Sequence, residues 1–238
     1  MVDFHQLRIV MSLATYLSFL ISPVILVITF IMIRFRYQPK NWNNVTKAAF
    51  SGLIGVVLLL AANFVMDLIW HGNLFNLRRM TFYVFVIVAF SAELGKLLPL
   101  RLYFYSKPGF KGPFESIRYS IIISLCFSML AIPLFAFGIV GTDMIKEPLL
   151  FLYTYPFANI FFGIVMGFFV GLGKMRKNLM IDESVALFIT SFFHGLFYFC
   201  FISSDIRLLV VTIIGFIIIG IMLLVKSTTF KVDKDQAV

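Results

Sequence analysis

Three ionisable residues stand inside long apolar stretches of the sequence and are the first candidates for chemistry: Glu93, Lys96 and His194. Glu93 and Lys96 are three residues apart, so on a helix they share one face and each can neutralise the other. A carboxylate can activate water as a general base, and a cation or a histidine can stabilise an oxyanion. These residue types suit hydrolysis, but an ion pair and a lone histidine are also ordinary structural features of helix bundles.

The elements that must position these residues are membrane-spanning helices. The chain has 238 residues, of which 61% are hydrophobic and 13% charged, and its mean hydropathy is +1.00. Soluble proteins are roughly 45–50% apolar and about 25% charged, so the composition excludes a water-soluble domain. The apolar runs are long and continuous, which also excludes the alternating pattern of a β-barrel. We therefore expect an all-α, polytopic membrane helix bundle, with residues 1–238 forming a single transmembrane domain.

Seven segments are long and apolar enough to span a bilayer, since a spanning helix needs about 20 mostly apolar residues. We treat the first as a retained anchor, because it is too long for the apolar region of a secretory signal. The predicted spans are Ile9–Ile33, Ala48–Trp70, Met80–Tyr105, Tyr119–Gly141, Leu149–Lys174, Val185–Ser203 and Leu208–Val225.

Basic residues are distributed unequally between the two sides of these spans. Most of the 20 Lys and Arg lie on one side, and Lys96 lies inside the third span. The other side holds Arg8, Arg78, Arg79, Lys146 and Arg207. The positive-inside rule then predicts that the N terminus lies outside and that the tail, residues 226–238, is cytoplasmic. The net charge of +9 is explained by this orientation, so we expect the lipid bilayer as a partner and no nucleic acid.

Small residues give a second signal in the fifth predicted span. Gly163, Gly167 and Gly171 follow one another at four-residue spacing, which removes side chains from one helix face and lets another helix approach closely. Such a face packs inside a bundle or against a helix of a second membrane protein. We therefore take the three glycines, together with Asn159, as candidate binding residues.

Four short stretches carry these residues in a recognisable order: Ser91-Ala92-Glu93-Leu94-Gly95-Lys96, Phe114-Glu115-Ser116-Ile117-Arg118-Tyr119, Gly163-Ile164-Val165-Met166-Gly167-Phe168 and His194-Gly195-Leu196-Phe197-Tyr198-Phe199. In this order and spacing, residues 90–199 resemble the protease core of the PrsW family of bacterial intramembrane proteases, relatives of the type II CAAX prenyl endopeptidases. The resemblance implies an endopeptidase that works inside the bacterial inner (cytoplasmic) membrane. Its catalytic positions would fall on Glu93 and His194, with Lys96 beside them.

The chain also departs from the family pattern. Ala92 stands where the resemblance implies a first Glu, Ala131 where it implies another Glu, Asn159 where it implies a His, and Tyr198 where it implies an Asp. Zinc hydrolysis usually takes three protein ligands, and the two remaining family residues are too few. We therefore expect no metal and no cofactor, except that a metal ion is conceivable if the chain is an active protease.

Depth within the membrane supports the grouping of these positions. Glu93, Ala131, Asn159 and His194 each fall near the middle of their own predicted span, so they should lie at one membrane level. From all this we expect a catalytically degenerate relative, a pseudoprotease that binds or scaffolds another integral membrane protein. Two alternatives stay open: an active protease that uses Glu93 and His194 to cleave a single-span protein such as an anti-sigma factor, and a small transporter.

Overall fold

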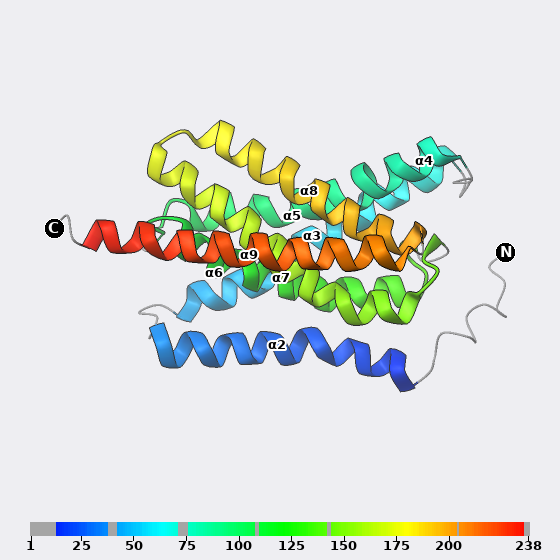
Figure 1. Cartoon of the computed structure of the whole chain (residues 1–238), viewed down its shortest axis with the longest axis horizontal. Helices are drawn as coiled ribbons and strands as arrows, with labels where there is room; N and C mark the ends of the chain where they lie inside the picture. The colour runs from blue at the N-terminus through cyan, green and yellow to red at the C-terminus, as the bar shows by residue number, and fades with distance from the viewer. Residues whose placement is uncertain are drawn as a thin grey trace.

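The structure is a bundle of long helices. The computed structural model describes residues 13–37, 42–70, 76–107, 110–141, 144–203 and 205–235, and within these ranges it contains helices and no strand. Seven of the helices in this part of the chain are long and apolar enough to cross a membrane. Figure 1 shows them running side by side along one long axis. The predicted all-α, multi-pass membrane architecture is therefore confirmed.

Six of the seven crossings are single helices, and the third crossing is built from four consecutive pieces. The third crossing consists of α4, η1, α5 and η2, where η1 and η2 are π-helical. The elements are α2 (Leu13–Tyr37), α3 (Trp42–Trp70), α4 (Leu77–Phe82), η1 (Tyr83–Phe90), α5 (Ser91–Pro99), η2 (Leu100–Phe104), α6 (Pro113–Ala136), α7 (Pro148–Arg176), α8 (Leu179–Ser203) and α9 (Ile206–Asp235).

The predicted spans differ from these helices at their ends. The predicted fourth span runs from Tyr119 to Gly141, whereas α6 begins at Pro113 and ends at Ala136. Proline is favoured in the first turn of a helix because its missing N–H has no partner there. Beyond the end of α6 the chain turns at Gly138, whose φ of 69° suits glycine. Residues 9–12 of the predicted first span lie outside the described residues.

Charged residues that lie outside the predicted sixth span belong to the first turns of its helix. α8 begins at Leu179 rather than Val185, and it includes Asp182 and Glu183. Glu183 Oε2 lies 3.1 Å from Nη1 of Arg101, and Asp182 Oδ1 lies 3.9 Å from Nη1 of Arg176. These ion pairs let the helix begin with acidic residues, which the helix dipole also favours. α9 similarly continues to Asp235, so residues 226–235 of the predicted tail are helical, and 236–238 lie outside the described residues.

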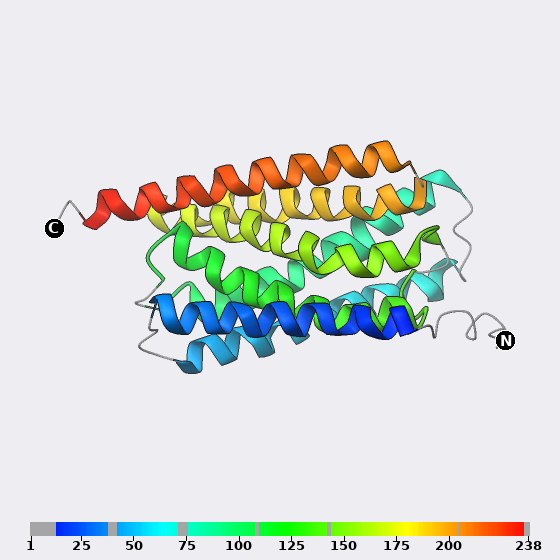
Figure 2. The same ribbon diagram turned by 60° about the horizontal axis from the view of Figure 1, so that its bottom comes forward.

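The crossings differ in how much of their surface the bundle covers. Of the most apolar window of α7, 83% is buried, compared with 22% for both α2 and α9. Figure 2 shows α9 along one edge of the bundle and α2 toward the opposite edge. α2 begins at one end of the bundle and α9 ends at the other, as an odd number of crossings requires. Which end faces the cytoplasm stays a prediction from the charge asymmetry.

The glycine face of α7 packs against α6 of the same chain. A Cβ on Gly167 would lie 2.5 Å from Cα of Ile117, and one on Gly163 would lie 3.0 Å from Cα of Ile121. Gly171 approaches the backbone of Pro113 in the same way. The glycines therefore serve helix packing within the bundle. α6 of the same chain occupies this face, and binding of a second protein by these glycines stays a prediction.

α5 is held equally closely by α3, and π-helical turns flank it. A Cβ on Gly95 would lie 2.9 Å from the backbone nitrogen of Gly55, so the two helices cross at backbone contact. In η2 the Tyr105 N–H donates to the Leu100 carbonyl, five residues back, at 3.0 Å. A π turn takes more residues than an α turn and is frequent at functional sites. In the third crossing, the short helix α5 lies between the π-helical segments η1 and η2.

Substitution of Gly167 by alanine tests the α6–α7 contact, with Gly215→Ala as the matched control. A Cβ at Gly215 would meet nothing within 4 Å. We expect Gly167→Ala to lower the unfolding free energy by about 1–3 kcal/mol, since the new methyl overpacks a backbone contact. Gly215→Ala should leave stability unchanged or raise it by up to about 1 kcal/mol. Thermal unfolding of the purified chain in mild detergent measures both, and equal melting temperatures would contradict the assigned packing.

Candidate functional site

The Glu93 carboxylate is the centre of a buried polar network. It lies in the first turn of α5, and its side chain has no exposed surface. Its Oε1 accepts a hydrogen bond from Nζ of Lys96 at 2.5 Å and lies 2.7 Å from Nδ1 of His194. The structure therefore contains the predicted ion pair on one helix face. It also brings His194 to the same carboxylate oxygen from α8, 101 residues further along the chain.

α7 completes the network through Asn159 and Tyr155. Lys96 Nζ donates to Oδ1 of Asn159 at 3.1 Å, and Nδ2 of Asn159 donates to the Tyr155 carbonyl at 3.0 Å. The Tyr155 hydroxyl lies 3.3 Å from Nε2 of His194. Glu93, Asn159 and His194 thus lie at one level, as their central positions in the predicted spans indicate. The network joins α5, α7 and α8.

The hydrogen-bond distances are compatible with a neutral His194. In that state its Nδ1–H donates to the Glu93 carboxylate, and its Nε2 accepts from the Tyr155 O–H. In this arrangement the histidine is neutral, and the charges of Glu93 and Lys96 cancel. A pair with no net charge is far less costly in hydrocarbon than either ion alone.

Aromatic rings enclose the charged atoms. Lys96 Nζ lies 4.9 Å from the ring centroid of Phe127 and 5.5 Å from that of Phe162. The Phe162 ring also stacks on His194, with centroids 4.8 Å apart. Cation–π contacts are strongest when they are desolvated, as here, so the rings stabilise the ammonium group. Because Glu93, Lys96 and His194 are at most 1% exposed, a substrate has no path to the carboxylate in this arrangement.

One acceptor in the centre of the network is unused. Oε2 of Glu93 is buried and has no hydrogen-bond partner among the described residues. Buried polar atoms of this kind are commonly satisfied by an ordered water. A water bound to Oε2 would stand beside a carboxylate that a lysine and a histidine already contact. That arrangement is the part of the site closest to general-base chemistry.

The positions that depart from the family pattern have other roles. Ala131 is fully buried in the apolar core beside Phe127. Tyr198 donates a short hydrogen bond from its hydroxyl to the Gly141 carbonyl in the loop after α6. In the same region Tyr83 donates to Oδ1 of Asn63 at 2.6 Å. Tyr198 therefore holds a loop at the end of the bundle, and the polar network does not include its hydroxyl contact.

The network does not have the composition of a metal centre. Within the described ranges, no three His, Cys, Asp or Glu side chains gather in a way that could hold a metal ion. Glu93 and His194 do lie together, but Oε1 and Nδ1 share a hydrogen bond, so these two atoms are not free to bind a metal ion. The third ligand position that zinc hydrolysis needs is not supplied by Asn159, which binds Lys96 instead.

Sequence reasoning missed three members of the site: Tyr155, Phe127 and Phe162. Tyr155 precedes Asn159 by four residues, so both lie on one face of α7, and this spacing was the available signal. The two phenylalanines gave no such signal, because the chain has 30 of them. Which rings surround Lys96 depends on how α6 and α7 pack.

No protein-family model, no curated protein and no solved structure matches this chain. The resemblance of residues 90–199 to the PrsW family therefore stays a prediction from the residues that carry it.

Proposed function

We propose that the chain is a catalytically inactive, PrsW-like protein of the bacterial inner membrane that binds or scaffolds another integral membrane protein. The observation that carries the proposal is the closed state of the polar network. Every charge in it is bonded to a neighbour inside the bundle, and Glu93, Lys96 and His194 are shielded from the surroundings. Groups in this arrangement connect helices, whereas a hydrolase must present them to water and a peptide.

The network supports a scaffold in a second way, because it fixes helix positions. Lys96 of α5 donates a hydrogen bond to Asn159 of α7, and Glu93 of α5 contacts His194 of α8. The glycine face of α7 is used internally as well. The least covered crossings are α2 and α9, of whose most apolar windows only 22% is buried, so their outward faces are the most open to a partner helix. We therefore assign partner binding to these peripheral helices rather than to Gly163, Gly167 and Gly171.

An intramembrane protease is the second candidate, and one observation favours it. Oε2 of Glu93 is the unpaired acceptor of the network, and a water bound there would lie beside a possible general base. In this mechanism the helices must separate before a substrate helix reaches Glu93. His194 would then assist, and Glu93→Gln would abolish cleavage of a single-span protein in membranes.

Purification from native membranes tests the proposed scaffold. We expect the tagged full chain, extracted in mild detergent, to elute with a second membrane protein at a fixed ratio. The double variant Glu93→Gln/Lys96→Met removes both charges together and should retain that partner, because the contact lies on the outside of the bundle. The composition and mass of the eluted complex are measured by mass spectrometry and light scattering.

Two results would contradict the scaffold. One is a chain that elutes alone in both forms. The other is a single-span protein that stays bound only when Glu93 or His194 is replaced, since trapping of that kind indicates a substrate. The second result would favour the protease and identify what it cleaves.

Stability measurements test whether the ion pair is structural. We expect Glu93→Ala to lower the unfolding free energy by about 3–5 kcal/mol, because Lys96 would be left charged and unpaired in the core. The double variant Glu93→Gln/Lys96→Met should recover most of this loss, because it leaves no uncompensated charge. Unfolding of the purified chain in mixed micelles measures the difference, with the exposed Asp205→Asn as the control. Equal losses in the single and double variants would show that the two side chains are not coupled.

A further inference from the structure

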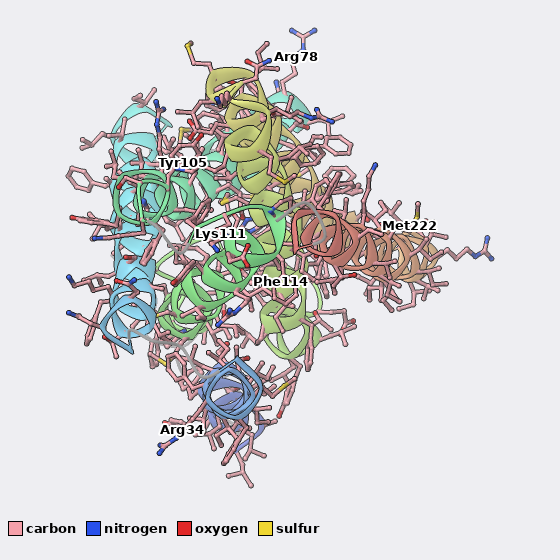
Figure 3. All side chains as sticks on the ribbon, turned by 90° about the vertical axis from the view of Figure 1, so that its left-hand side faces the viewer. Arg34, Arg78, Tyr105, Lys111, Phe114 and Met222 are labelled. Atoms are coloured by element: carbon pink, nitrogen blue, oxygen red, sulfur yellow. The ribbon has the colours of Figure 1, made fainter. Side chains whose placement is uncertain are left out.

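A hollow lies between the ends of α2 and α3 on the side of the bundle predicted to be cytoplasmic. Its volume is about 220 Å³. Figure 3 looks onto this end of the bundle and shows the labelled Arg34 side chain reaching outward from α2. The lining residues are Phe30, Ile31, Arg34, Val45 and Thr46.

The lining changes from apolar to basic along α2. Phe30 and Ile31 lie about one helical turn before Arg34, and the apolar part of α2 ends at Phe35. Arg34 therefore stands at the boundary between hydrocarbon and headgroups, where a long basic side chain keeps its charge in the polar layer. Thr46, near the beginning of α3, borders the hollow at the same end.

The hollow carries a positive charge that neither of its own helices neutralises. The sequence has no acidic residue between Asp3 and Asp67, so α2 and all but the last turns of α3 are free of carboxylates. Arg34 makes no ion pair with another described residue. Lys47, exposed and adjacent to Thr46 in sequence, adds a second positive charge to this end of α3.

Two other hollows of the bundle lack the combination of an apolar lining and a basic side chain. The larger, between α7 and α9, has a volume of about 500 Å³ and is lined by apolar side chains and Thr154. The other lies along α8, where Ser184 is its polar residue. Neither is lined by a charged side chain, so charge distinguishes the hollow at Arg34.

We propose that this hollow binds an anionic phospholipid. Its phosphate would be bound by the Arg34 guanidinium, and the beginning of one acyl chain would lie against Phe30, Ile31 and Val45. A phospholipid has the same order of charge and hydrocarbon along the membrane normal as the lining of the hollow. Guanidinium groups suit phosphate because they donate two parallel hydrogen bonds to it. This site does not involve the Glu93 network, and it shares α2 with the surface proposed for the partner.

Native mass spectrometry of the delipidated full chain, titrated with phosphatidylglycerol or with phosphatidylcholine of the same acyl chains, tests the proposal. We expect tighter binding of the first phosphatidylglycerol than of the first phosphatidylcholine. Arg34→Ala should weaken phosphatidylglycerol binding about fivefold, the effect of one basic residue near an anionic membrane surface. Lys111→Ala, which removes an exposed charge outside the hollow, should not weaken it. Ile31→Trp, which fills the hollow and keeps its charge, should weaken binding of the lipid.

The proposal is overturned if Arg34→Ala and Lys111→Ala weaken phosphatidylglycerol binding equally, since the effect would then come from overall charge. It is also overturned if Ile31→Trp leaves binding unchanged, or if phosphatidylcholine binds as tightly as phosphatidylglycerol. Each variant is first compared with the unmodified chain by thermal unfolding in lipid-free detergent, so that a loss of binding is measured only on folded protein.

Discussion

The ion pair of Glu93 and Lys96 is the interaction on which the arrangement of the inner helices depends. An ionisable group at membrane depth costs about 2.5–3.5 kcal/mol even on the most lenient scale, because hydrocarbon cannot solvate it. Each charge must therefore find its partners within the protein. The pair does so through Asn159 on α7 and His194 on α8. Displacement of α7 or α8 would remove one of these polar partners from the buried pair, so the cost of burial becomes a constraint on helix position.

Close backbone contacts supply the rest of the cohesion. Apolar side chains gain little by leaving lipid for a protein interior, so membrane helices associate through close packing and polar contacts. Glycines provide this packing at several contacts, among them Gly163 and Gly167 against α6, and Gly95 against Gly55 of α3. The second contact holds α5 against α3. π-helical stretches flank α5 on either side.

The sequence was sufficient to predict the seven crossings, because long apolar runs have one stable form in a bilayer. It was also sufficient to group Glu93, Asn159 and His194, because each lies at the middle of its span. Helix ends were predicted less well: α8 includes Asp182, paired with Arg176 at the end of α7, and Glu183, paired with the distant Arg101 of η2. The π-helical turns and the rings around Lys96 depend on packing that no local pattern encodes.

Access to the carboxylate separates a structural network from a catalytic one. A hydrolase in a membrane must keep its carboxylate near water and open a route for a peptide, at a cost in stability. Here Lys96 and His194 both bind Oε1 of Glu93, and aromatic rings cover them. Ala92, Ala131 and Tyr198 stand where the proposed resemblance implies carboxylates, which would be costly to bury. What remains is a buried charge pair on α5 that polar side chains of α7 and α8 contact. Such contacts join helices, and a protease would have to open them before a substrate reached Glu93.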